Sequence, residues 1–227
     1  MESETVRTTS INEQVYKILK RRIIERRFAA GAKLDINALA AELGISRMPV
    51  VDALMRLETE GLVERRNRVG TFVAPLDRAK YEEIYAARDM VEQWAVTEII
   101  ARITKDDIAA LQHILEQTHA LLQNVTEDTF DYQKYSEYDG AFHLSLIRLC
   151  GNSYITSFYM SLNSHVQIMR VLSLGALQRS QETQLEHDAI LSAYKAHDVK
   201  KCEAAHRIHL EKSRAGVLQL LEIHEHV

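Results

Sequence analysis

The sequence predicts a mainly α-helical protein of two domains: a small N-terminal domain of three helices and one β hairpin, followed by an antiparallel six-helix bundle. Three observations lead to this fold class. The 227 residues include only 8 Gly and 2 Pro, with 46% hydrophobic and 26% charged residues, a composition typical of folded helical proteins. Apolar residues recur at helical spacing along most of the chain. The one clear hairpin pattern precedes Pro75, so we expect domains at residues 1–75 and 76–227.

The N-terminal domain begins with an amphipathic stretch. Residues 11–27 carry apolar side chains three and four positions apart, which predicts the first helix. Asp35 is expected to cap a short second helix that ends at Gly44. Ser46 is expected to cap the third helix with its hydroxyl group, and Gly61 ends that helix.

The stretch after the third helix predicts a two-stranded hairpin. "LVERR" and "TFVA" are the expected strands, joined by the short turn "NRVG". Three helices followed by a hairpin form the order of a winged helix-turn-helix, in which the second helix of the motif enters the major groove of DNA. A helical protein-protein module with an incidental basic edge is the competing interpretation.

Charge is distributed unequally between the two predicted domains. Residues 1–75 carry 13 Lys and Arg against 10 Asp and Glu, whereas the remainder carries 15 against 22. A basic domain attached to an acidic one is common when only the first meets nucleic acid. The third helix exposes its first turn, where Arg47 is a natural donor to a base or phosphate, and Arg68 stands beside Gly70 in the wing turn. The candidate DNA contacts from this pattern are Ser46, Arg47, Met48, Val51, Arg68 and Gly70.

"LAAELGISRMPVVDALMRLETEGLV" followed by "NRVGTFVA" resembles the DNA-binding domain of the GntR family of bacterial repressors. The all-helical remainder resembles the FadR-type branch of that family. Relatives usually carry threonine at the position of Met48 and arginine at that of Val51, and the position of Asn37, a further candidate contact, is often basic. These departures from the family pattern predict that DNA binding persists with an altered operator, in which Met48 and Val51 contact thymine methyl groups.

Acidic and imidazole side chains lie on apolar helical faces of the second domain. Asp139 and His143 are four residues apart and share one face, while His187 and His209 each lie among small or apolar residues. Together they form a plausible metal shell of nitrogen and oxygen donors, suited to zinc, nickel or manganese. From spacing alone, a histidine on an apolar face is more often a hydrogen-bonded core residue, and both interpretations stay open.

The family resemblance favours the metal site. Metal-binding members of the FadR-type branch carry an Asp-x3-His pair followed by two single histidines on later helices, which Asp139, His143, His187 and His209 match. A divalent ion is therefore expected, zinc first, with nickel or manganese as alternatives. Its open coordination positions would accept a small carboxylate effector, so the metal would serve ligand sensing.

Two further residues are candidates for effector binding. Arg88 lies on a face expected to be buried, and a buried guanidinium needs a partner. Glu92, one turn further on, is one possible partner, and the carboxylate of an effector is the other, which the resemblance implies. His165 is either a pocket residue, a partner of a metal ligand, or a core residue. The remaining histidines receive no role: His113, His119, His197, His206, His224 and His226.

An enzyme is the alternative to a regulator. Glu116-x-x-His119 and Glu203-x-x-His206 resemble di-iron ligand pairs, but helical angles turn both carboxylates away from the interior. A metal-dependent hydrolase built on the histidines lacks an obvious general base. The family resemblance implies instead a transcriptional repressor that binds double-stranded operator DNA as a homodimer. The chain lacks an apolar run of membrane-spanning length and a secretion signal, so a cytoplasmic protein is expected.

Overall fold

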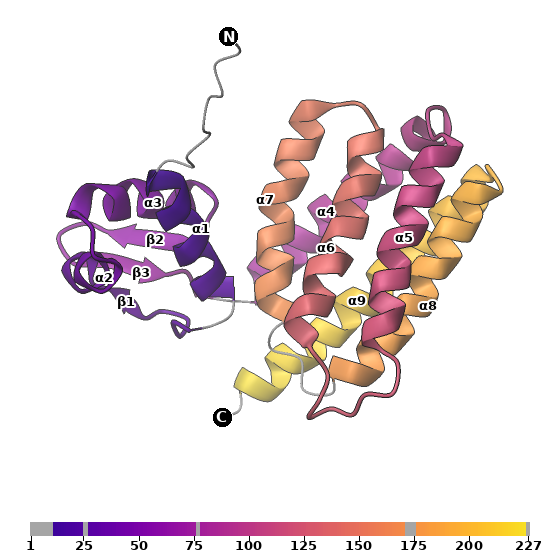
Figure 1. Ribbon diagram of the computed structural model, residues 1–227. Coiled ribbons are helices and arrows are strands. Elements are labelled where there is room, and N and C mark those ends of the chain that lie inside the picture. The colour runs from indigo at the N-terminus through magenta and orange to yellow at the C-terminus, as the bar shows by residue number, and fades with distance from the viewer. Residues whose placement is uncertain (1–10, 25–26, 76–77, 171–175, 226–227) are drawn as a thin grey trace, which may run out of the picture. The chain divides into compact units, whose positions relative to one another are not determined.

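The chain folds into two compact units, residues 1–76 and 77–227, which are described separately (Figure 1). The computed structural model describes the backbone at residues 11–24, 27–75, 78–170 and 176–225, and the side chains of these ranges except 163–170, 176 and 219–225. Within these described ranges no helix is long and apolar enough to span a lipid bilayer.

The first unit contains three helices and a small antiparallel sheet. The helices are α1 (Ile11–Ile24), α2 (Ile36–Leu43) and α3 (Arg47–Thr59), and the strands are β1 (Lys33–Leu34), β2 (Val63–Arg66) and β3 (Gly70–Val73). The sheet order is β1-β3-β2. This arrangement confirms the predicted winged helix-turn-helix.

Local chemistry sets the ends of α2 as predicted. The Asp35 side chain accepts hydrogen bonds from the backbone N–H groups of Asn37 and Ala38, and Gly44 ends the helix in the left-handed conformation at φ 65°. β1 was not expected from sequence. Its two residues pair with β3, so that Lys33 lies opposite Phe72.

The second unit is a bundle of helices, as predicted. Six are described: α4 (Arg78–Ile100), α5 (Lys105–Leu121), α6 (Tyr132–Leu149), α7 (Ser153–Arg170), α8 (Ala176–Lys195) and α9 (Val199–Glu225). α4 packs against α7 and α9, and α8 packs against α5 and α9. Their shared core includes Val96, Leu115, Phe142, Ile190 and Cys202. Phe142 directly precedes a residue of the candidate site and Ile190 follows another by one helical turn, so that site lies within the hydrophobic interior.

Polar caps define the starts of several bundle helices. Thr104 and Asp107 form a reciprocal capping box at the start of α5. Asp131 accepts a hydrogen bond from the N–H of Lys134 and starts α6 later than expected. The Asn152 side chain caps α7 by accepting hydrogen bonds from the N–H groups of residues 154 and 155.

Candidate DNA-reading surface and histidine cluster

Helix α3 presents one apolar face to the core and its first turn to solvent. Val50, Ala53, Leu54 and Leu57 are buried, as their spacing predicted. Met48 is 64% exposed. A methionine this exposed makes little contact with the hydrophobic core, so its side chain is available to a partner molecule.

Ser46 precedes α3 but does not cap it as predicted. It occupies the N-cap position with extended backbone, yet its side chain makes no cap hydrogen bond. The donor that an N-cap hydroxyl often uses is the N–H at the third helical position, which is Pro49 here and has no N–H. The exposed Ser46 hydroxyl is therefore not engaged with the helix it precedes.

The wing turn holds two residues at positive φ. Arg68 has φ 62° and Gly70 has φ 140°. A Cβ atom on Gly70 would lie 2.7 Å from the Cε atom of Lys33, whose aliphatic stem passes over the glycine. The positive φ favours glycine here, whereas the close approach alone does not require it, because the end of the flexible Lys33 side chain could shift. The contact also places the cationic Lys33 beside the wing, a placement that depends on the unexpected strand β1.

The described cations of the first unit include both paired and unpaired side chains. Arg22, Arg56, Arg65 and Arg66 form ion pairs with glutamate side chains of the same unit. By contrast, the side chains of Lys33, Arg47 and Arg68 are exposed, and each of these side chains lacks a hydrogen bond or ion pair to the residues that the structure describes. These three cations are unneutralised by protein groups, which is the condition expected of side chains that meet phosphates.

An open groove of about 450 Å³ separates α3 from the wing. Its walls are Ile36, Val51 and Leu54 on one side and residues 65–71 on the other. Val51 is half-buried in this groove, whereas Asn37 is exposed at the start of α2. Three of the predicted DNA contacts therefore border one concave surface: Val51 of α3, and Arg68 and Gly70 of the wing.

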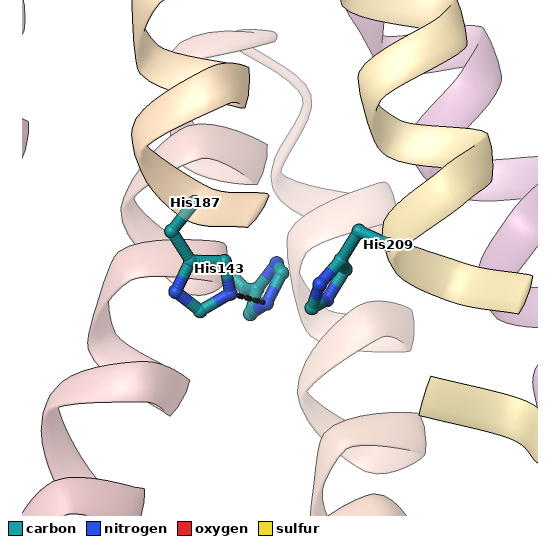
Figure 2. A group of neighbouring side chains, drawn as sticks. All are labelled: His143, His187 and His209. Atoms are coloured by element: carbon teal, nitrogen blue, oxygen red, sulfur yellow. Dashed lines mark hydrogen bonds between the residues drawn. The ribbon is translucent and has the colours of Figure 1, made fainter. Parts of the chain in front are cut away.

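Three helices of the second unit bring three histidines together. His143 from α6, His187 from α8 and His209 from α9 are almost fully buried, and one potential ligand atom of each lies within 4.8 Å of the others (Figure 2). The Nε2 atoms of His143 and His187 are 3.1 Å apart. The predicted three-histidine set is therefore assembled at one point in the bundle.

Asp139 lies beside this cluster. One of its carboxylate oxygens is 3.8 Å from Nε2 of His187, and the side chain is 2% exposed. It is not part of the set whose ligand atoms all lie within 4.8 Å of one another. Asp139 is therefore adjacent to the cluster, one helical turn before His143, rather than at its centre.

Burial keeps at least two of the clustered imidazoles neutral at pH 7. Desolvation lowers the pKa of His209 to about 4, against the raising effect of its hydrogen bond to Glu186. Desolvation, and then the nearby positive charge of Arg88, hold the pKa of His143 well below its usual range. Neutral imidazole is the form that binds metal ions.

The hydrogen bonds of His209 fit a metal ligand. Its Nδ1 atom lies 2.9 Å from a carboxylate oxygen of Glu186, while its Nε2 atom is buried without a hydrogen-bond partner. A buried polar atom without a partner costs roughly 1 to 3 kcal/mol. A cation held by three neutral imidazole nitrogens would remove that cost, and this donor set is one that zinc prefers.

Arg88 joins the cluster to a second buried network. Its Nε atom donates a 2.5 Å hydrogen bond to Glu92, which was one of its two expected partners. Its Nη2 atom lies 3.3 Å from Nε2 of His143, and its Nη1 atom is buried without a hydrogen-bond partner. Although burial opposes the charged form, the Glu92 carboxylate holds the pKa of Arg88 well above its usual value. One donor of a permanently charged group therefore remains available next to the histidines.

Sequence reasoning missed His206, which received no role. It is buried, with Nδ1 3.1 Å from Glu92 and Nε2 3.2 Å from the hydroxyl of Tyr194. Glu92 also accepts a 2.6 Å hydrogen bond from Tyr159. The available signal was its position three residues before His209 and four after Cys202, on the same side of α9. The side chain of His165, a predicted effector contact, lies outside the described residues.

Family models match both units. The model of bacterial regulatory proteins of the gntR family matches residues 11–73, and the FCD domain model matches residues 83–212. The chain belongs to the GntR family.

Named relatives of this GntR-family protein are regulators. It is 28% identical over 182 residues to the HTH-type transcriptional regulator YdhC of Bacillus subtilis strain 168, covering 80% of each chain. It is 30% identical over 186 residues to the gluconate operon transcriptional repressor of Bacillus licheniformis, covering 79% of this chain and 74% of that protein.

A solved structure shares the fold. The structure of E. coli McbR/YncC matches with a TM-score of 0.80 at 22% identity, covering 93% of this chain and 99% of that one. The family consists of DNA-binding transcriptional regulators, and the alternative of a metal-dependent hydrolase is not favoured. The GntR-family protein is thus a DNA-binding regulator rather than an enzyme.

Proposed function

We propose that this regulator is a repressor whose affinity for its operator is controlled by a small organic acid bound beside a metal ion in the FCD domain. The observation that carries this proposal is the buried cluster of His143, His187 and His209, next to an arginine with an unused donor. A hydrophobic core has no need for such a group of polar atoms, and burying them without partners is costly. A bound ligand that contacts these polar atoms would offset the cost of burying them.

DNA recognition is assigned to the first unit. Arg47 and Arg68 provide unneutralised charge on α3 and the wing, and Gly70 permits close approach of the backbone. Lys33 adds a third cation next to Gly70. The proposed contact surface also includes the exposed or half-buried residues Asn37, Ser46, Met48 and Val51. Met48 and Val51 present methyl groups rather than donors, so contact with thymine methyl groups is their expected mode of reading.

The metal ligands are assigned to the second unit. His143, His187 and His209 would each supply one imidazole nitrogen, and Asp139 would supply a carboxylate oxygen from its place beside His187. A bound zinc, nickel or manganese ion would supply a Lewis-acidic centre with open positions for an oxygen ligand. The protein's own part is to hold these side chains close together and away from water.

Arg88 is assigned to the effector. Glu92 fixes the guanidinium through Nε. Nη1 has no partner, and it would donate to one oxygen of a carboxylate. His165 remains a proposed second contact. The chemical class that satisfies both an arginine and a divalent cation is a small organic acid.

The protein is proposed to act as a homodimer, which suits a palindromic operator. Support comes from large apolar side chains exposed on two helices that pack against each other. Met90 and Trp94 are 64% and 45% exposed on α4, and Tyr154 and Phe158 are 87% and 42% exposed on α7. Exposed clusters of aromatic and methionine side chains are typical of protein interfaces.

The test uses full-length protein and DNA from the region upstream of its own gene. Binding is measured at two salt concentrations against an unrelated fragment of equal length, with zinc-loaded and chelator-treated protein, and with a panel of mono- and dicarboxylic acids. We expect a preference for the upstream fragment that persists at higher salt. One acid should change the affinity about five- to 150-fold, the usual range of allosteric coupling.

Two histidine variants provide the control. His187→Ala should lose zinc and the response to the acid, whereas His119→Ala should retain both, because His119 is half exposed and pairs with Asp188 outside the cluster. Unchanged zinc content in His187→Ala would contradict the metal assignment. Equal binding to both DNA fragments that vanishes with salt would contradict sequence-specific reading.

A further inference from the structure

Glu186 lies between a cation and the cluster. It directly precedes His187 in the chain, but its side chain points to the neighbouring helix α9 and contacts His209 instead. One oxygen, Oε2, accepts from Nδ1 of His209 at 2.9 Å and also from Nη2 of Arg179 at 2.9 Å. The other, Oε1, accepts from Nη1 of Arg179 at 2.8 Å and lies 3.5 Å from Nζ of Lys212.

We propose that Glu186, held in place by the guanidinium of Arg179, fixes the tautomer and ring orientation of His209 and thereby raises the affinity of the cluster for a divalent metal. This inference rests on the proposed metal site. It makes Glu186 and Arg179 positioning residues, since neither is proposed to contact the ion itself.

The tautomer follows from hydrogen-bond chemistry. An ionised carboxylate only accepts hydrogen bonds, so Nδ1 of His209 must carry the hydrogen in this contact. In a neutral imidazole the lone pair is then on Nε2. That Nε2 atom is buried and lacks a partner, and the ring lies 4.9 Å from that of His143 and 4.8 Å from that of His187, measured between centroids. The lone pair is therefore kept for a ligand within the cluster.

Arg179 explains how the carboxylate can stay in this place. The Glu186 side chain is only 6% exposed. Two N–H groups of Arg179 donate to its two oxygens at 2.8 and 2.9 Å and offset the cost of burying the carboxylate. The two parallel N–H donors of Arg179 also fix the plane of the carboxylate, which sets the direction from which His209 is held.

Helix α8 therefore contributes two residues to the site. It supplies His187 as a ligand, and through the adjacent Glu186 it orients a ligand that belongs to α9. Carboxylates that hold ligating histidines in this way typically contribute 10- to 100-fold to metal affinity. The competing explanation is that Glu186 merely forms an ion pair with Arg179, which would have no effect on metal binding.

The experiment compares three variants of the full-length protein. Zinc dissociation constants are measured by competition with a chromophoric chelator, and the site is examined by the visible spectrum of bound Co²⁺. Glu186→Leu removes the acceptor, while Glu186→Gln removes the charge but retains an oxygen that accepts from Nδ1. Glu182→Gln is the control, because Glu182 also contacts Arg179, at 3.4 Å, but is not among the hydrogen-bond partners of His209.

We expect Glu186→Leu to weaken zinc binding about 10- to 100-fold and to change the Co²⁺ spectrum. Glu186→Gln should be intermediate, and Glu182→Gln should match the wild type. Wild-type affinity in Glu186→Leu would overturn the inference, as would equal losses in the Leu and Gln variants. If circular dichroism shows that Glu186→Leu does not fold, a Gln variant indistinguishable from Glu182→Gln would overturn it.

Metal uptake by the wild-type protein distinguishes failure of the proposed metal site from failure of the role inferred for Glu186. A wild-type protein that takes up no zinc, nickel or manganese refutes the proposed metal site, and this inference falls with it. Normal metal uptake in the wild type together with unchanged affinity in the Glu186 variants refutes the inference alone.

Discussion

Single residues of the first unit differ in what their charges do. Arg56 donates a 2.8 Å hydrogen bond to Glu13, and its guanidinium lies over the ring of Tyr16 at 3.7 Å from the centroid. Arg47 lies on the same helix and has no partner among the described side chains. The first arginine joins α1 to α3, whereas the second is available to a phosphate or a base. Charge alone does not distinguish the two residues, but their contacts do.

Exchanging each of these arginines for alanine should therefore affect different properties. We expect Arg47→Ala to weaken operator binding by about 1 to 3 kcal/mol and to leave the melting temperature unchanged. Arg56→Ala should lower the melting temperature and leave the operator affinity of the folded protein close to wild type. Fluorescence anisotropy with labelled operator and differential scanning calorimetry give the two readouts. Wild-type affinity in Arg47→Ala would remove this residue from the proposed surface.

The candidate site shows which residue-level features could be read from sequence. His143, His187 and His209 became candidates because each lies on an apolar helical face, which periodicity reveals, and the family resemblance then favoured them as metal ligands. Glu186 could not be found in this way. It adjoins a predicted ligand in sequence, but its partner His209 comes from another helix, and the contact depends on how α8 packs against α9. Spacing within one helix carries no information about that.

At the scale of elements, caps and turns were predicted where local chemistry decides them. Asp35 and Gly44 delimit α2 as expected, since both act through their own or adjacent backbone. Strand β1 was missed because two residues are too few to show alternation, and it exists only through pairing with β3. The hydroxyl cap at Ser46 failed for a local reason, the missing N–H of Pro49. A helix cap can be predicted from sequence when the residues that would donate their backbone N–H groups to it are also considered.

Helices α4 and α7 carry the proposed dimer surface, which a charge should disrupt. We expect Trp94→Glu to convert the dimer to a monomer, because burying an unpaired carboxylate in an apolar interface is costly. Leu185→Glu is the matched control, since Leu185 is 70% exposed on α8. Size-exclusion chromatography with light scattering gives the mass of each variant. A Trp94→Glu dimer, or a monomeric wild type, would contradict this assignment of the interface.

Across the whole molecule, the residues proposed to contact DNA lie in one unit, and those proposed to bind the metal and the effector lie in the other. Every proposed DNA contact lies within residues 1–76, and every proposed metal and effector contact within residues 77–227. The charges follow the same division, because residues up to Pro75 carry an excess of basic groups and the remainder an excess of acidic groups. An acidic effector unit also opposes non-specific attachment to DNA, which leaves recognition to the first unit.

This division predicts where zinc should stabilise the protein. A ligand present at about one hundred times its dissociation constant stabilises the state that binds it by roughly 2.7 kcal/mol. Its effect should be confined to the unit that holds the cluster, because stabilisation by binding acts on the cooperative unit that contains the site. Hydrogen-deuterium exchange with mass spectrometry should therefore show slower exchange in α6, α8 and α9 after zinc is added to chelator-treated protein, and unchanged exchange in α2 and α3. In His187→Ala, the addition of zinc should not slow exchange in any of these helices. Equal protection of both units by zinc in the wild type, without DNA, would contradict the assignment, because it would mean that the ion also stabilises residues that contribute none of the proposed ligands.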